Sequence, residues 1–572
     1  MRRPPLLPTL LLAAACATTR GMSPEAAHAA FTKLVDDTFS EEFAFNPVNA
    51  TNAGIHSYDG QLEPWTDVRI RAHVVALEGL LDRTTALWTE RTALGTDDLI
   101  DLEALDGHLR VELLDWNLLH FTARNPMTYA GRAGNAIDPL LKRDFAPARE
   151  RLKSVISRLE KVPALYTAGK GNVTSPPREW TELAIGQAKG TEGYLRDTLA
   201  AWAKDAAGDD AVLWADFQRA NITATAATQD FLHWLTKTVL PQSTGTWAIG
   251  ARAYVTLLKH AEFISTPLDE LLAQGEAQLQ KDRQAFIATA REIDPTRSPE
   301  EVFASLAEDH PTAADLLPYA RRTLEQVRQF AVRKELVTFP SEARPKVEDT
   351  PVFMRIGNYA SMDTPGAYET RATEAFYYIT PPEQSWDRKH IEEHLREFNS
   401  SMLPIIHVHE AYPGHFVQFL WAPRFPTKVR KLLPNNSNVE GWAHYSEEMV
   451  IEEGFADDNP KLKLAQLEEA LVRDCRYVVG IGLHTTTLTV EQGADRFVRD
   501  CYQNASVAYD EARRGTYDPT YLYYTSGKLM ILALRQDYLS QKGGTLRQFH
   551  DAFLSVGPLP IPLVRKLLLP EH

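Results

Sequence analysis

One stretch decides how the rest of this sequence is interpreted: residues 409–415 read HEAYPGH. Two imidazoles, with a carboxylate directly after the first, are the parts of a site at which Zn²⁺ activates water. Such sites use three protein ligands and keep a fourth position open for the water. The carboxylate beside the first histidine then takes the proton from that water. The stretch therefore predicts that His409 and His415 bind zinc and that Glu410 is the general base.

The spacing of the two histidines departs from the usual H-E-x-x-H. His415 follows His409 by six residues, which is about 240° on an unbroken helix and too far round to share a metal. Between them lie Pro413, which breaks the helical hydrogen-bond ladder, and Gly414, which tolerates unusual dihedral angles. We therefore expect a break that returns His415 to the face of His409. The alternative is an ordinary helix end with two surface histidines.

A second motif, EGWAHYSEE, follows at residues 440–448. The Asn- and Ser-rich run before it is good N-cap material and predicts a helix that begins near Val439. Glu440 and Glu447 are seven residues apart and lie on one side of that helix. We expect Glu440 to be the third metal ligand. Glu447 is the alternative ligand, or a partner that orients a ligand imidazole.

Several strings of this sequence resemble one bacterial family. They are HEAYPGH, EGWAHYSEE, GIGLHT at 480–485 and FHDAFLSVGPLP at 549–560, with NPVNAT at 46–51 and GIHSYD at 54–59 near the start. The family is catalogued as domain of unknown function eight-eighty-five and is grouped with thermolysin-like zinc metallopeptidases. The resemblance covers most of the chain. It implies a mainly α, zincin-like metallopeptidase fold with a small β-sheet next to the active-site helix.

The family strings also indicate two further catalytic candidates. His484 follows a glycine-rich kink and matches the string GIGLHT, so we expect it to reach the cleft. A zinc hydrolase needs a donor for the oxyanion, and a tyrosine hydroxyl is a donor at neutral pH. Tyr524 fits the family's Tyr-x-x-Gly position, and Tyr521 and Tyr523 are the alternatives.

Two other polar residues near these motifs are expected to have structural roles. His407 lies two residues before His409, about 200° away on a helix, and so points off the metal face. Arg535 could bind a substrate carboxylate, but a structural ion pair is the preferred interpretation.

Composition indicates a globular enzyme and excludes some partners. Charged residues are 24% of the 572, and the net charge of -15 leaves no basic patch for nucleic acid. We expect an N-terminal helical lobe over residues 22–337 and a catalytic lobe over 338–572, within one continuous fold. Prolines are dense from 338 to 382, where residues 352–356 and 375–379 are predicted strands. Such a strand either pairs with an extended peptide or merely caps the helices.

The N-terminus is typical of an exported lipoprotein. Arg2 and Arg3 precede an apolar run and then small residues directly before Cys16. We therefore expect residues 1–16 to be a signal peptide and Cys16 to carry a lipid, which places the protein in the periplasm or at the outer membrane. The other cysteines, Cys475 and Cys501, are expected to be buried and unpaired, with a disulfide as the alternative.

The sequence thus predicts a zinc-dependent hydrolase of the cell envelope that cleaves short peptides, as an oligopeptidase or a carboxypeptidase. The expected cofactor is Zn²⁺ and the expected partner is a peptide substrate, with no nucleic acid and no membrane contact beyond the lipid anchor. One alternative is a zinc amidase or esterase with a non-peptide substrate. The other is a non-catalytic envelope lipoprotein that retains a degenerate fold.

The lipid anchor is testable directly. A Cys16→Ala protein is expected to leave the membrane fraction while keeping its fold, because the acylated thiol is the predicted attachment point. Membrane fractionation with circular dichroism of the released protein measures both. If the Cys16→Ala protein stayed in the membrane fraction, the prediction of a lipid anchor at Cys16 would be wrong.

Overall fold

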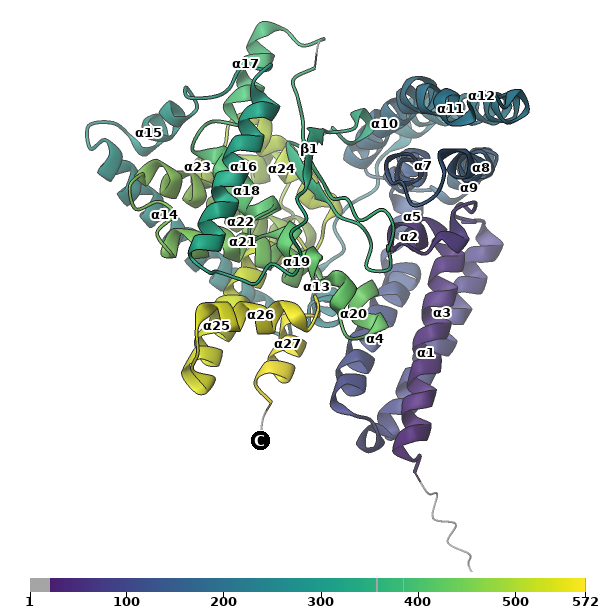
Figure 1. Cartoon of the computed structure of the whole chain (residues 1–572), viewed down its shortest axis with the longest axis horizontal. Helices are drawn as coiled ribbons and strands as arrows, with labels where there is room; N and C mark the ends of the chain where they lie inside the picture. Colours follow the sequence, from purple (N-terminus) through teal and green to yellow (C-terminus); the bar gives the residue numbers. More distant parts are fainter. Residues whose placement is uncertain (1–20, 356–357, 384, 571–572) are drawn as a thin grey trace, which may run out of the picture.

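The computed structural model describes residues 21–355, 358–383 and 385–570. The predicted signal peptide and Cys16 lie outside the described residues. The described chain is mainly helical with one small sheet, as the sequence predicts. In Figure 1 the purple and blue N-terminal helices lie on one side, and the green and yellow C-terminal helices on the other. None of the described helices is long and apolar enough to cross a membrane.

The first helices form an elongated bundle. Leu102, Leu105 and Leu109 recur at helical spacing and are fully buried, as that spacing predicts. Their hydrophobic core also contains residues close to the C-terminus, such as Leu563, so the two ends of the chain share one interior. The helices are α1 (Pro24–Phe45), α2 (Pro47–Asn52), α3 (Asp67–Thr89) and α4 (Thr96–Leu114).

A second group of helices follows and has a core of its own. Leu152, Val155 and Leu159 are fully buried there, again at helical spacing. The group comprises α5 (Phe121–Arg124), α6 (Met127–Ala130), α7 (Arg132–Lys142), α8 (Ala148–Leu159), α9 (Val162–Asn172), α10 (Arg178–Gly193), α11 (Ala200–Ala207) and α12 (Ala211–Trp234).

A third core joins helices from distant parts of the sequence. Leu279 and Phe286 on α14 are buried in the same cluster as Tyr477 on α22, so helices from both sides of residues 337/338 share it. Ser298 and Glu301 form a capping box at the start of α15. These helices are α13 (Ala251–Ala261), α14 (Leu268–Ile293), α15 (Pro299–Leu306), α22 (Pro460–Thr485), α23 (Val490–Cys501) and α24 (Ala505–Tyr517).

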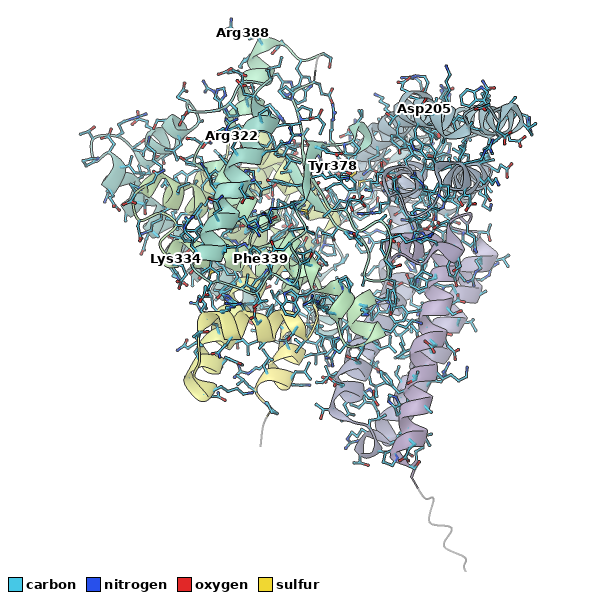
Figure 2. The ribbon with its side chains drawn as sticks, in the orientation of Figure 1. Asp205, Arg322, Lys334, Phe339, Tyr378 and Arg388 are labelled. Carbon is cyan, nitrogen blue, oxygen red and sulfur yellow. A yellow bond between two sulfur atoms is a disulfide. The ribbon has the colours of Figure 1, made fainter. Side chains whose placement is uncertain are left out.

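The sheet has three short strands in the order β1-β3-β2. β3 (Phe376–Ile379) is central and fully buried, and it pairs in parallel with β1 (Lys346–Asp349) and antiparallel with β2 (Ala360–Asp363). Figure 2 places Tyr378 of β3 between the two sides of the molecule, where Lys142 of α7 lies over its ring. The sheet therefore links the N-terminal helices to the C-terminal ones.

One of the two predicted strands is confirmed and the other is wrong. Residues 375–379 contain β3, but Val352–Met354 form a 3₁₀ turn. Pro351 fixes φ at the start of that turn, and the N–H of Met354 donates to the Pro351 carbonyl at 2.8 Å. Both neighbours of β3 are other segments, 346–349 and 360–363.

The remaining helices include those that carry and contact the motif at residues 409–415. Among them, α21 and α25 cross with their backbones in contact: a Cβ added to Gly441 would lie 2.6 Å from the Cα of Gly527. A Cβ on Gly527 would overlap the carbonyl oxygen of Ser437. The helices are α16 (Leu316–Arg333), α17 (Arg388–Arg396), α18 (Met402–Glu410), α19 (His415–Leu420), α20 (Lys428–Leu432), α21 (Asn436–Glu452), α25 (Tyr523–Lys542), α26 (Leu546–Ser555) and α27 (Ile561–Leu568).

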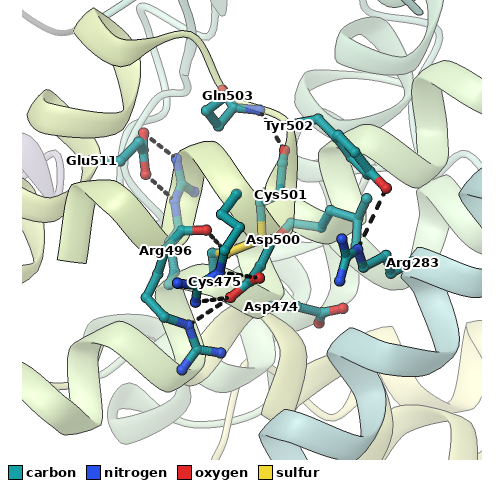
Figure 3. The surroundings of a disulfide bond; sticks show 12 residues. Arg283, Asp474, Cys475, Arg496, Asp500, Cys501, Tyr502, Gln503 and Glu511 are labelled. Atoms are coloured by element: carbon teal, nitrogen blue, oxygen red, sulfur yellow. Dashed lines mark hydrogen bonds and ion pairs between the residues drawn. A yellow bond between two sulfur atoms is a disulfide. The ribbon is translucent and has the colours of Figure 1, made fainter. Parts of the chain in front are cut away.

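The expectation of unpaired cysteines is wrong, because Cys475 on α22 and Cys501 at the end of α23 form a disulfide. The packing of α23 against α22 brings their Cα atoms to 6.4 Å, which is within disulfide range. Figure 3 shows the bond beside ion-paired side chains, including Arg496 with Asp500. A disulfide is consistent with an exported chain.

The contact between α21 and α25 should not tolerate a side chain at Gly527. Gly527→Ala is expected to lower the free energy of unfolding by about 1–3 kcal/mol, because the methyl group has no space and the backbone must shift. Gly79→Ala on α3 is the matched control, since a Cβ there meets nothing within 4 Å. That change should stabilise the protein by about 0.5–1 kcal/mol. Equal effects of the two substitutions in denaturant titrations would contradict this interpretation of the contact.

Candidate metal centre

The motif at residues 409–415 is a sharp chain reversal between two helices. α18 ends at Glu410 and α19 begins at His415. The N–H of Gly414 donates to the carbonyl of Val408 at 3.0 Å, and a Cβ on Gly414 would overlap the carbonyl oxygen of His409. The Tyr412–Pro413 peptide bond is cis. The predicted break is therefore present, and only glycine fits position 414.

Hydrogen bonds hold α21 against this reversal. The indole N–H of Trp442 donates to the carbonyl of Pro413 at 2.9 Å, and Gln418 of α19 donates to the Asn438 side chain at 2.9 Å. Asn435 caps α21, so the helix begins at Asn436, slightly before the predicted start. These contacts place the first turns of α21 beside His415.

The result is a convergence of three side chains. Glu440 Oε2 lies 3.4 Å from Nε2 of His409 and 3.4 Å from Nε2 of His415. The ligand atoms of all three residues lie within 4.8 Å of one another. Two atoms that each lie about 2.0–2.1 Å from one tetrahedral ion are separated by about 3.4 Å. Both separations from Glu440 Oε2 thus match those between two ligands of a single ion.

The donor set also fits zinc chemically. Two imidazoles and one carboxylate form a known catalytic zinc set. The Oε2 atom of Glu440 is buried, and no hydrogen-bond partner for it exists in the described part of the chain. A buried acceptor without a partner is costly, and a cation at this point would satisfy it.

Glu447 is the residue that orients His409. Its Oε1 lies 2.6 Å from Nδ1 of His409, so the other nitrogen of that imidazole is directed at Glu440. Burial opposes the charge of Glu447, but Arg473 and His444 hold the pKa of its carboxyl well below the usual range. Of the two roles predicted for Glu447, its position matches that of a partner that orients a ligand imidazole, and not that of a metal ligand.

A metal that binds His409 would have to compete with a proton. Burial alone would lower the pKa of His409, but its contacts with Glu440 and Glu447 raise it to about 9 in the metal-free protein. A zinc ligand must be a neutral imidazole. A metal must therefore displace the proton that the two carboxylates retain.

Glu410 lies beside the group and is not one of its three converging residues. Burial and the charge of Glu440 raise the pKa of its carboxyl, while His409 and the backbone N–H of Met362 on β2 partly offset the rise. A cavity of about 40 Å³, lined in part by His409, Glu410 and Glu447, adjoins it. That volume is enough for water.

The tyrosine-rich segment reaches the same region through the start of α25. Glu440 lies within electrostatic range of both Tyr523 and Tyr524 and raises their pKa in addition to burial. Tyr523 donates its hydroxyl to Asp518 at 2.8 Å. Tyr524 instead accepts a hydrogen bond from Arg514 at 2.7 Å, and its own hydroxyl donates no hydrogen bond to the residues that the structure describes.

The structure places two other candidates away from the cluster. Nε2 of His484 donates to the carbonyl of Gly515, and its ring stacks on Tyr254 in the third core. Tyr521 donates to Glu511. The expectation that His484 reaches the cleft depended on a kink at the glycines that precede it. α22 is continuous through Thr485, so this kink does not form.

Two predicted structural roles are confirmed. His407 is buried between the hydroxyls of Thr323 and Tyr377, each 2.8 Å away. Arg535 pairs with Glu452 at 2.7 Å.

One residue near the site was not foreseen from the sequence. Arg514 on α24 donates to Tyr524 and lies over the rings of Tyr521 and Tyr524. Within the described ranges it forms no ion pair, although it is half-buried. Arg514 follows Arg513 in a helical segment and gives no sequence signal of its own, because its relation to Tyr524 depends on the packing of α24 against the start of α25.

The fold and the cluster define a large helical protein with a zinc-type donor set at a helix break. The chain belongs to the family described as bacterial protein of unknown function (DUF885), whose model matches residues 47–568. Among curated proteins, none matches the chain.

Two solved structures share the fold. A candidate lipoprotein of unknown function from Shewanella oneidensis has a TM-score of 0.77 and 25% identity, over 94% of this chain and 99% of that one. A candidate lipoprotein from Colwellia psychrerythraea has a TM-score of 0.78 and 17% identity, over 96% of this chain and 98% of that one.

The cluster predicts a defined metal stoichiometry. His409→Ala and Glu440→Gln are each expected to lose the one equivalent of metal that this cluster holds, whereas Glu447→Gln should weaken the affinity of the cluster by about 10–100-fold. Binding near neutral pH should release about one proton and weaken as pH falls, because His409 is protonated below its raised pKa. Calorimetric titration of chelator-treated protein, in buffers of different ionisation enthalpy, measures both. A Glu440→Gln protein that binds as many equivalents of metal as the wild type would rule out this ligand set.

Proposed function

We propose that this protein is a zinc-dependent peptidase of the bacterial cell envelope that hydrolyses short peptides. The observation that carries the proposal is the convergence of His409, His415 and Glu440 beside the buried carboxyl of Glu410. The lipoprotein-like N-terminus and the two solved relatives named as candidate lipoproteins support the envelope location.

The role of each residue follows from its position. A bound Zn²⁺ supplies Lewis acidity, which lowers the pKa of water and polarises a carbonyl. Glu410 accepts the proton of the attacking water at its carboxylate and returns it to the leaving amine. Its raised pKa suits this work, since a base with a pKa nearer the operating pH both takes and returns a proton readily.

Tyr524 is the residue best placed to donate to the oxygen that becomes negative during attack. Arg514 donates to its phenolic oxygen at 2.7 Å, which fixes the oxygen and leaves the hydroxyl proton available. Arg514 also supplies positive charge to the same region, which favours a negatively charged intermediate. His484 has no place in this scheme, because its contacts are with Gly515 and Tyr254.

The sheet offers a way to hold an extended peptide. In the described part of the chain β2 is an edge strand that pairs with β3 on one side, and the N–H of Met362 on β2 is directed at Glu410. An edge strand beside a catalytic carboxylate can align a peptide backbone by main-chain hydrogen bonds. This placement favours a peptide over an amide or ester without an extended backbone.

The proposal is tested by separating catalysis from metal binding. Glu410→Gln keeps the size of the side chain but cannot take a proton, so peptide turnover is expected to fall by about 10²–10⁴-fold. Metal content should be unchanged, because Glu410 is not one of the three converging residues. Turnover of a quenched-fluorescent peptide library and metal analysis of the same samples are the two measurements.

Glu393→Gln, an equal change at an exposed position on α17, is the matched control and should leave both quantities unchanged. Tyr524→Phe should lower kcat with little change in KM, because its donor acts on charge that develops during the reaction. Near-wild-type turnover by Glu410→Gln would refute the proposed mechanism. Hydrolysis of esters or amides without any peptide cleavage would refute the substrate class.

A further inference from the structure

A second group of metal-type side chains lies in the N-terminal bundle. Glu42 of α1, His73 of α3 and Glu112 of α4 each offer a ligand atom, and these atoms lie within 4.8 Å of one another. The three helices lie together at the side of the molecule opposite α25, and α18 and α21 are in the other part of the fold (Figure 1). The group is therefore separate from the cluster formed by His409, His415 and Glu440.

The imidazole of His73 is held rigidly. It is fully buried and stacks on Phe45 with ring centroids 3.8 Å apart, and Trp116 lies edge-on to it. Its Nδ1 lies 2.8 Å from Oε1 of Glu41, which also accepts from Arg69 at 2.8 Å. A carboxylate on Nδ1 fixes the tautomer in which Nε2 is a lone-pair donor.

The remaining nitrogen of His73 has no protein partner. Its Nε2 is buried without a hydrogen bond in the described part of the chain. Because Glu41 engages Nδ1, Nε2 is the atom left for a ligand. A buried nitrogen without a partner is costly, so an occupant that accepts its lone pair would be stabilising.

The two carboxylates lack a compensating cation. Among the described residues, the carboxylate of Glu42 accepts hydrogen bonds only from the side-chain amides of Asn46 and Asn49, at 3.0 and 3.4 Å. Within residues 21–355, 358–383 and 385–570, no lysine or arginine lies within 4.0 Å of the carboxylate of Glu42 or Glu112. Two neighbouring carboxylates beside a lone-pair nitrogen repel one another and attract a positive ion.

We propose that His73, Glu42 and Glu112 form a second metal site that binds a divalent transition cation, Zn²⁺ or Mn²⁺. One imidazole and two carboxylates suit these ions, since imidazole favours Zn²⁺ and carboxylates favour Mn²⁺. The ion joins α1, α3 and α4, one ligand from each helix. Its role is to hold the bundle together, independently of any hydrolysis at the other cluster.

The site is tested in a protein that lacks the first cluster. A chelator-treated His409→Ala chain is titrated with Zn²⁺ by calorimetry and with Mn²⁺ by electron paramagnetic resonance. One equivalent of either ion is expected to bind, and its binding should raise the melting temperature. Adding Glu112→Gln should abolish binding, whereas adding Glu78→Gln, the same change at an exposed position on α3, should leave it intact.

Two further variants keep the test decisive. Glu41→Gln should weaken the affinity by about 10–100-fold without changing the stoichiometry, since it only orients His73. Glu42→Gln replaces Glu112→Gln if circular dichroism shows that the latter does not fold. No binding by folded His409→Ala protein, or binding that survives both ligand substitutions, would overturn the site. Failure of peptide hydrolysis would not affect it, because the readout is bound metal.

Discussion

The contact between the backbones of α21 and α25 determines how the candidate centre is built. At Gly441 and Gly527 the two helices approach until a single methyl group would overlap main-chain atoms. Glu440 immediately precedes one of these glycines, and Tyr524 lies one turn before the other. A wider crossing would move the tyrosine away from the carboxylate. The glycines of EGWA and of Tyr-x-x-Gly are therefore part of the geometry of the site, although they have no side chain to offer.

Much of this arrangement could be predicted from sequence because its signals are local. Helical spacing predicted the buried leucines of α4 and α8, and the Pro-Gly pair predicted the break before His415. The errors came from interactions between distant segments. The disulfide depends on α23 packing on α22, the strand partners of β3 come from segments 346–349 and 360–363, and Arg514 meets Tyr524 only through the packing of α24 on α25. Periodicity along one segment does not encode such contacts.

The two candidate metal groups share one arrangement on unrelated helices. In each, a glutamate binds Nδ1 of a buried histidine, Glu447 for His409 and Glu41 for His73. The free nitrogen is then available to a metal, with further carboxylates close by. The resemblance is one of chemistry, since orienting an imidazole by a carboxylate is a general way to present a lone pair. The two groups differ in whether a general base lies beside them. Glu410 adjoins the group of His409, which is consistent with hydrolysis at that group and with a structural ion in the bundle.

The interruption after Glu410 does more than return His415 to the correct face. In an unbroken H-E-x-x-H helix, the glutamate would lie in mid-helix, with further turns after it. Here Glu410 is the last residue of α18, at the negative end of the helix dipole. That end disfavours the ionised carboxylate, in the same direction as burial and the charge of Glu440. The two histidines His409 and His415 and the N–H of Met362 lower the pKa of Glu410 and offset this only in part. The two additional residues of HEAYPGH thus act on the base as well as on the ligand, by ending the helix at the residue whose proton affinity matters.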